Sequence, residues 1–261
     1  MNARPEPLLH DLRRSLTVVA LLAISAIAWA FLVRSEVAMQ SMAGDGPIAA
    51  LMWLMMRPSE GAVTYVLGAA LMWVVMMIGM MTPAVVPMAM VFRGIDRTGH
   101  RDRDTLLFAG GYLGGWVVFG LAAALLQLSL HARGLLHGHA LAASPPLAGM
   151  LLFAAGVYQL TPWKEACLHH CRSPLGFFLE HWSPGARGAV SMGLRHGLYC
   201  VGCCWVLMLL MFVGGAMSVV TMAVLCAFIL AERLLPPGPW VSRIPGAVMI
   251  LWGAAMAAGS P

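Results

Sequence analysis

The sequence contains few charged residues. Only 10% of its 261 residues are Asp, Glu, Lys or Arg, whereas soluble domains carry about 25%. Hydrophobic residues make up 60% of the chain, and the mean hydropathy is +0.81. A water-soluble core cannot bury so much apolar surface. The composition therefore excludes an ordinary soluble protein and predicts an all-α, polytopic transmembrane helix bundle.

Other absences exclude further classes. The net charge of +5 is small, and the arginines lie in loops between apolar runs, so we expect no nucleic acid partner. The six cysteines lack the spacing of a secreted disulfide framework. Tyrosine is also scarce, with four residues against 21 methionines. The composition is thus strongly biased toward thioether side chains.

Seven apolar runs are candidate membrane spans, with six as the alternative count. They lie at 16–33, 63–91, 106–130, 147–163, 189–213, 219–230 and 245–258. The first run resembles a signal peptide but exceeds the usual apolar length of about 7–15 residues, so we expect a retained helix. The predicted organisation is a cytoplasmic N-terminal segment over 1–15 and a single transmembrane helical domain over 16–258.

The basic residues predict the orientation of these spans. With the N-terminus inside, twelve basic residues fall on the inner side: Arg4, Arg13, Arg14, Arg93, Arg97, Arg101, Arg103, Lys164, Arg172, Arg187, Arg233 and Arg243. The outer side then holds Arg34, Arg57 and Arg133. Because short cytoplasmic loops are enriched in Lys and Arg, this distribution indicates a cytoplasmic N-terminus.

Residues 196–211 combine an apolar sequence with three thiols and an imidazole. In a helix, residues four apart share a face, so His196, Cys200, Cys204 and Met208 form one ridge with Cys203 beside it. Thiolate and thioether ligands together favour copper(I), and thiolate with imidazole also suits zinc. A disulfide within the ridge is disfavoured, because Cβ atoms four residues apart are separated by about 5–6 Å and a disulfide needs about 3.5–4.5 Å.

The second predicted span carries a methionine stripe beside a proline. Its candidate thioether ligands are Met72, Met76, Met77, Met80 and Met81. Pro83 lacks an N–H group, so it frees the carbonyl of residue 79 and is expected to kink the helix there. The second and fifth predicted spans cross the membrane in opposite directions. The methionine stripe and the cysteines of the fifth span are therefore both predicted near the middle of the membrane, where they can face one another.

A second pair of cysteines lies between the fourth and fifth spans. Cys167 and Cys171 are four apart, so a short helix would bring both thiols to one side. Lys164 and Arg172 are near them in sequence, and their charges are expected to favour thiolates. The predicted topology places this pair at the cytoplasmic face, where we expect it to act as a docking pair for metal.

These motifs resemble a bacterial family of predicted metal-binding integral membrane proteins, a domain of unknown function. The resemblance spans about residues 51–235 and rests on the segments 72–83, 158–174 and 193–208. It implies metal binding in a bacterial inner (cytoplasmic) membrane, and no reaction comes with it.

The favoured hypothesis is a multi-pass membrane protein that binds a soft metal, copper(I) before zinc, in its transport, delivery or homeostasis. The expected partners are the lipid bilayer and a soluble metal chaperone or a metalloenzyme. No residue is assigned a catalytic role, and a non-enzyme is favoured. Two alternatives stay open: a membrane thiol–disulfide oxidoreductase using Cys200, Cys203 and Cys204, and a structural membrane subunit.

Overall fold

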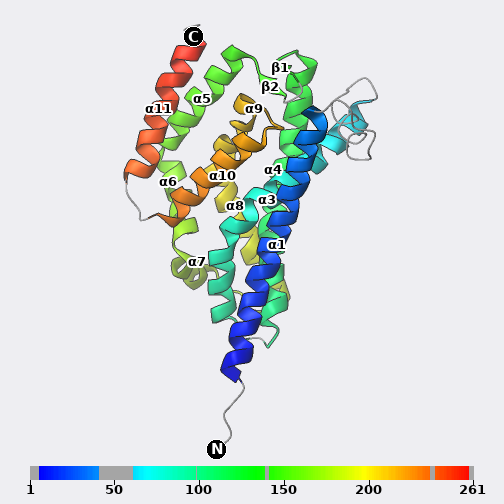
Figure 1. Ribbon diagram of the computed structural model, residues 1–261. Coiled ribbons are helices and arrows are strands. Elements are labelled where there is room, and N and C mark those ends of the chain that lie inside the picture. Colours follow the sequence, from blue (N-terminus) through cyan, green and yellow to red (C-terminus); the bar gives the residue numbers. More distant parts are fainter. Residues whose placement is uncertain (1–5, 41–60, 98, 139–140, 236–238, 259–261) are drawn as a thin grey trace, which may run out of the picture.

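The computed structural model describes residues 6–40, 61–97, 99–138, 141–235 and 239–258. This part of the chain is mostly helical, which confirms the helical part of the predicted fold class. A two-stranded antiparallel hairpin, β1 (Leu136–His137) and β2 (Ala142–Ala143), is a small departure from the all-α prediction. The start of α1 (Glu6–Gln40) and the end of α11 (Pro239–Ala257) lie at opposite ends of the bundle (Figure 1).

Five helical segments of the described chain are long and apolar enough to cross a membrane. They lie in α1 (Glu6–Gln40), α3 (Ala62–Ile95), α4 (Arg101–Ala132), α8 (Gly185–Leu209) with its extension α9 (Met211–Gly214), and α11 (Pro239–Ala257). Helix α8 packs most extensively against α4, while α3 packs against α4 and α1, and α11 packs along α5 (Figure 1).

The remaining helices are shorter than a bilayer is thick. They are α5 (Pro145–Gln159), α6 (Pro162–Arg172), α7 (Pro174–His181) and α10 (Val219–Leu234). The 15 residues of α5 and the 16 of α10 extend over about 22–24 Å, whereas the apolar core of a bilayer is about 30 Å thick. The runs predicted as fourth and sixth spans therefore fall short, and the span count and the cytoplasmic N-terminus stay predictions.

The break between α5 and α6 has a local cause. Thr161 leaves the helical conformation and its hydroxyl accepts a hydrogen bond from the Lys164 backbone N–H at 3.3 Å, while Pro162 occupies the first turn of α6. At the other end of the chain, α1 continues from Glu6 through the expected boundary at residue 15, and residues 1–5 of the predicted N-terminal segment lie outside the described residues.

The carbonyl that Pro83 frees is satisfied by a neighbouring helix. Helix α3 continues through Pro83 to Ile95, and the Gly79 carbonyl oxygen accepts hydrogen bonds from Ser25 Oγ at 2.7 Å and from Trp29 Nε1 at 3.2 Å. The predicted unpaired carbonyl thus becomes the point where α1 attaches to α3, because an unsatisfied carbonyl is costly inside an apolar core.

Glycines allow α4 and α8 to touch backbone to backbone. A Cβ on Gly193 would lie 2.0 Å from the Phe108 carbonyl oxygen, and one on Gly111 would lie 2.3 Å from the Val190 carbonyl oxygen. Of the two glycine pairs on α4, Gly111 and Gly115 face α8, whereas a Cβ on Gly110 or Gly114 would meet nothing within 4 Å. This close approach places the side chains of α4 directly against those of α8.

Candidate metal centre

The predicted ridge on residues 196–208 is one face of α8. His196, Cys200, Cys204 and Met208 are all buried, as is Cys203, with at most 1% of each residue exposed. Because α8 is continuous from Gly185 to Leu209, the four-residue spacing aligns these side chains in a column toward the centre of the bundle. The helical ridge that the sequence predicted is therefore present.

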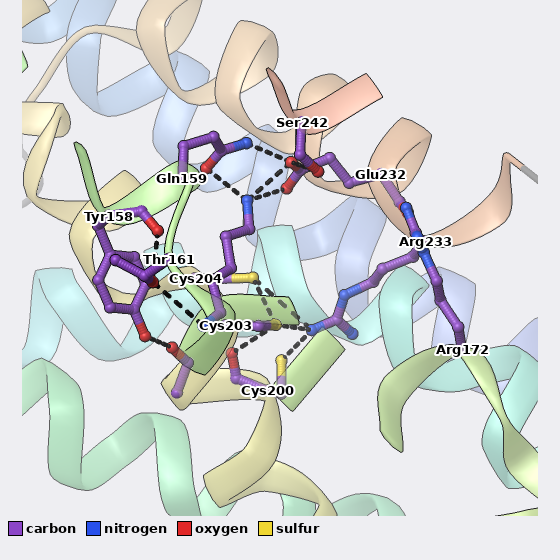
Figure 2. A network of polar contacts seen from close by, with 12 residues as sticks. Tyr158, Gln159, Thr161, Arg172, Cys200, Cys203, Cys204, Glu232, Arg233 and Ser242 are labelled. Carbon is purple, nitrogen blue, oxygen red and sulfur yellow. Dashed lines mark hydrogen bonds and ion pairs between the residues drawn. The ribbon is translucent and has the colours of Figure 1, made fainter. Parts of the chain in front are cut away.

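Helix α6 brings the other two cysteines to the same place. Cys167 Sγ lies 2.9 Å from the position that a Cβ would occupy on Gly202 of α8, so the lack of a side chain there admits the thiol. Cys171 forms a hydrogen bond with Cys203. The Tyr158 hydroxyl donates a hydrogen bond to the Gly202 carbonyl oxygen and fastens α5 to the same turn of α8 (Figure 2).

Together these contacts form one group, the thiol cluster: Cys167, Cys171, Cys200, Cys203 and Cys204. The sequence predicted a docking pair separate from an inner site, whereas the structure brings the two groups of cysteines together. Helix α6 is an independent short helix that packs along α8, so Cys167 and Cys171 approach the α8 cysteines and do not stand apart from them.

The thiols of α8 contact one another and a tyrosine from α4. Cys203 Sγ and Cys204 Sγ are 3.2 Å apart, and Cys203 Sγ also donates to the Cys200 carbonyl oxygen at 3.2 Å. The Tyr112 hydroxyl lies 2.9 Å from Cys200 Sγ, with either atom able to donate. The three sulfur atoms are thus held inside the bundle, where the cysteine side chains are shielded from water.

A guanidinium group completes the cluster. Arg233, near the end of α10, bonds to Cys200 Sγ through its NH2 nitrogen, which also lies 3.5 Å from Cys203 Sγ and 3.8 Å from Cys204 Sγ (Figure 2). Sequence reasoning placed Arg233 in a loop, whereas α10 extends to Leu234 and turns the side chain inward. A permanently charged cation therefore lies among the three thiols.

The residue before Arg233 belongs to a second buried polar group. Lys164 Nζ lies 2.7 Å and 2.8 Å from the two carboxylate oxygens of Glu232, and both side chains are 1% exposed. Gln159 bonds to both partners, and Ser242 Oγ donates to the Glu232 carboxylate at 3.1 Å (Figure 2). This network ties α5, α6, α10 and α11 together beside the thiol cluster.

The two cations near Cys167 and Cys171 do not play the role that the sequence suggested. Lys164 is paired with Glu232, and Arg172 Nε donates to the Glu232 main-chain carbonyl oxygen at 2.7 Å. Burial raises the pKa of the Cys167 thiol, and the hydrogen bond with Cys203, together with burial, raises the pKa of Cys171 well above its usual range. Both thiols therefore hold their protons more firmly than an exposed cysteine.

The methionine stripe of α3 is buried, and α3 packs mainly against helices other than α8. Met72, Met76, Met77, Met80 and Met81 are each at most 2% exposed. Helix α3 packs mainly against α4 and α1, whereas α8 packs mainly against α4 and α6, so α4 is their shared neighbour. The sequence predicted a site directly between the second and fifth spans, and α3 meets the end of the fifth span where Trp73 packs on Phe212 of α9, with ring centroids 5.5 Å apart. A further contact of this stripe is made by Cys226 of α10, whose thiol donates to the Met80 carbonyl oxygen at 3.6 Å.

His196 lies within an aromatic group. Its ring stacks on Tyr112 with centroids 5.5 Å apart and meets Phe177 edge-on at 5.3 Å. Its Nδ1 atom is buried and has no hydrogen-bond partner among the described residues. The stacking fixes the ring beside the tyrosine that contacts Cys200, so this nitrogen stays available to a ligand or a proton.

Within the described part of the chain, no group of three or more His, Cys, Asp or Glu side chains is placed to hold a metal ion. The sulfur atoms instead contact one another and the Arg233 guanidinium. Their chemistry nevertheless suits a soft monovalent metal, because thiolates select copper(I) among biological cations. A metal that bound here would replace these sulfur contacts and the cysteine protons.

Sequence reasoning missed Tyr112 and the placement of Arg233 and Glu232. A signal for Arg233 was present, since it lies seven residues after Cys226 and thus on the same face of one helix. Glu232 and Lys164 are oppositely charged residues at the edges of apolar runs, which is typical of a buried pair in a membrane protein. Tyr112 carried no such signal, because its role depends on how α4 packs.

Fold and site together define a helical bundle with a buried thiol centre that suits a soft metal. The sequence profile of the PpoB2 family, described as a copper chaperone, matches residues 70–256. The chain therefore belongs to this family, which supports the metal-related part of the resemblance noted above; the description does not mention a membrane. A search of curated proteins and a search of solved structures gave no match.

Proposed function

We propose that this protein binds copper(I) as cargo at the thiol cluster and passes it on within the inner membrane of a bacterium. The observation that carries the proposal is the convergence of two half-buried cysteines of α6 on three buried cysteines of α8. Membership of a family described as a copper chaperone supports copper over zinc. The five apolar helices support a membrane location.

The proposed ligands fall into three groups. The five cysteines of the thiol cluster come first, since soft thiolates bind copper(I) strongly. His196 and Met208 lie on the same buried face of α8 and are proposed as auxiliary ligands. The α3 methionines, Met72, Met76, Met77, Met80 and Met81, are proposed as a holding region for copper that moves to or from the cluster. The proposed protein partner is a soluble metal chaperone or a metalloenzyme.

The test measures retained copper(I) after anaerobic loading and removal of excess metal. The double variants Cys167→Ser/Cys171→Ser and Cys200→Ser/Cys204→Ser should each retain less than about a tenth of the wild-type copper, because both remove ligands from one shared site. Cys226→Ser is the matched control, since it removes a buried thiol that contacts Met80, and it should retain copper normally.

Three results would contradict this proposal. Copper retained equally by wild type and by a variant without cysteines would remove copper(I) from the thiol cluster. Loss in the Cys200/Cys204 variant with normal affinity in the Cys167/Cys171 variant would restore the separate docking pair. Retention of manganese or magnesium in place of copper would also contradict it, since these ions prefer oxygen ligands.

The thiol–disulfide oxidoreductase remains a second candidate because Cys203 Sγ and Cys204 Sγ are already 3.2 Å apart and Cys171 contacts Cys203. An oxidoreductase must cycle its cysteines between thiol and disulfide, whereas a copper carrier keeps them reduced. Trapping free thiols with an alkylating reagent before and after turnover separates the two functions.

A further inference from the structure

The three cations around the thiol cluster differ in whether they have an anionic partner. Lys164 is neutralised by Glu232 at 2.7 Å, and Arg172 donates to a main-chain carbonyl oxygen. Arg233 has no carboxylate within ion-pair distance in the described part of the chain, and its Nε atom is buried without a hydrogen-bond partner there. Its polar contacts are the sulfur atoms of Cys200, Cys203 and Cys204.

A cation held in this way is costly unless negative charge accompanies it. Arg233 is partly buried, and its Nε atom is shielded from water. Guanidinium groups stay protonated in proteins, and withdrawing such a charge from water without an opposite charge nearby is unfavourable. The groups in contact with Arg233 that can supply negative charge are the three thiols, once they are thiolates; Cys171 and Tyr112 are ionisable groups that also interact with it. Arg233 is therefore placed to stabilise negative charge on the sulfur atoms.

Metal binding changes this charge in a way that depends on the ion. For any fixed number of thiolate ligands, a copper(I) complex carries one more negative charge than a zinc(II) complex. A positive group next to the sulfur atoms therefore stabilises the copper(I) complex more than the zinc(II) complex. Ligand softness favours copper(I) at such sites, and a fixed cation adds a preference based on charge alone.

We propose that Arg233 is the counter-cation of the thiol cluster and thereby selects monovalent over divalent soft metals. It accompanies the sulfur atoms in the metal-free protein and neutralises part of the negative charge of the copper(I)–thiolate complex in the loaded protein. This inference rests on the proposed copper(I) binding. Arg233 acts as a positioning and specificity-determining residue, because it binds no metal itself.

The experiment compares the affinities of purified full-length protein for copper(I) and for zinc(II) under anaerobic conditions, each in competition with a chelator of known affinity. Silver(I) is a second monovalent probe that avoids copper redox chemistry. Arg233→Gln removes the charge but keeps hydrogen-bonding atoms, and Arg233→Lys keeps the charge. Arg233→Gln should lower the ratio of copper(I) to zinc(II) affinity by about tenfold or more, which corresponds to about 1.4 kcal/mol.

The controls separate charge from folding. Arg233→Lys should keep the affinity ratio within about threefold of wild type, since the positive charge that sets the preference remains. Arg172→Gln removes a neighbouring arginine that bonds to the Glu232 carbonyl oxygen, and it should leave the ratio unchanged. Silver(I) should follow copper(I) in every variant, because the effect depends on ionic charge.

Each result bears on one of the two proposals. Wild-type protein that fails to bind copper(I) at all would overturn the proposed function, and the role of Arg233 with it. Wild-type binding with an unchanged ratio in Arg233→Gln would overturn the role of Arg233 and leave the proposed function standing. Equal losses of copper(I) and zinc(II) affinity in Arg233→Gln, or the same ratio change in Arg172→Gln, would reduce Arg233 to a structural residue.

Discussion

Among single residues, Lys164 and Glu232 matter both for the stability of the fold and for the geometry of the candidate site. Their ion pair is 1% exposed on both sides, and Glu232 precedes the arginine that contacts the thiols. A buried pair contributes little relative to an apolar pair of equal size, but removing one partner strands the other charge. The pair therefore constrains how α6 and α10 pack beside the thiol cluster.

We predict that Lys164→Met lowers the free energy of unfolding by about 3–5 kcal/mol at neutral pH. Burial raises the pKa of Glu232, and Lys164 opposes that rise, so the variant should raise this pKa further in the folded protein. The folded variant then binds a proton more readily than the unfolded chain, and the loss should shrink as the pH falls through the raised pKa. Denaturant unfolding in detergent at several pH values measures this effect.

The double variant Lys164→Met/Glu232→Gln is the control for this prediction. It removes both charges, so part of the lost stability should return and the dependence on pH should disappear. An equal loss in the single and double variants at every pH would show that the shape of Lys164, and not its charge, holds the helices together.

At the scale of elements, the contact between α4 and α8 has the sharpest steric requirement. We predict that Gly193→Ala destabilises the protein by about 1–3 kcal/mol, because the new Cβ would lie 2.0 Å from the Phe108 carbonyl oxygen and the helices must separate. Thermal unfolding in detergent measures this, and copper(I) retention should fall with it, since Tyr112 of α4 contacts Cys200.

Gly114→Ala provides the matched control on α4. Nothing lies within 4 Å of its added Cβ, and alanine favours a helix over glycine by up to about 1 kcal/mol. This variant should be as stable as wild type or slightly more stable. If both glycine variants lost stability equally, the backbone contact between α4 and α8 would not be what limits packing.

How far the elements could be predicted depended on how local their causes are. The ridge on α8 and the carbonyl freed by Pro83 follow from spacing and from proline chemistry within one helix, and both are present. Thr161 and Pro162 carry a local signal for the start of a new helix, but the apolar run 147–163 predicts a single span through them. Which glycine pair of α4 faces α8 could not be predicted, because that depends on the rotation of one helix against another.

For the whole molecule, the question is whether the methionines of α3 and the thiol cluster handle the same ion. We predict that replacing Met76, Met77, Met80 and Met81 by Leu leaves the fold intact, since such swaps usually cost under about 1.5 kcal/mol each. Total copper retention should fall, because thioethers bind copper(I) and leucine does not. Elemental analysis measures retention, and the expression level is the control for folding.

Unchanged copper retention in this variant would remove the methionines from the site. The redox state of the cysteines should be the same in variant and wild type, because methionine cannot form a disulfide. If the wild-type thiols cycled through a disulfide during turnover, the oxidoreductase alternative would replace the copper carrier.

The convergence of the five thiols was the part of the site that the sequence could not reveal. Cys171 and Cys203 are 32 residues apart, and their contact depends on α6 lying along α8 at the gap left by Gly202. Arg233 reaches the same position from a third helix. Residue spacing predicts which side chains share a helix face, but contacts between distant helices arise only from their packing.

Helix α10 links the two sulfur-rich parts of the molecule mechanically. Its Cys226 contacts the Met80 carbonyl oxygen and its Arg233 contacts the thiol cluster. These residues are seven positions apart, which corresponds to about 10 Å along the helix axis. Two turns of helix behave as a stiff rod over that length. An axial shift of α10 that draws the Arg233 guanidinium away from the sulfur atoms must therefore also strain the contact between Cys226 and α3. Helix α10 thus couples the two sulfur-rich regions even when no ion moves between them.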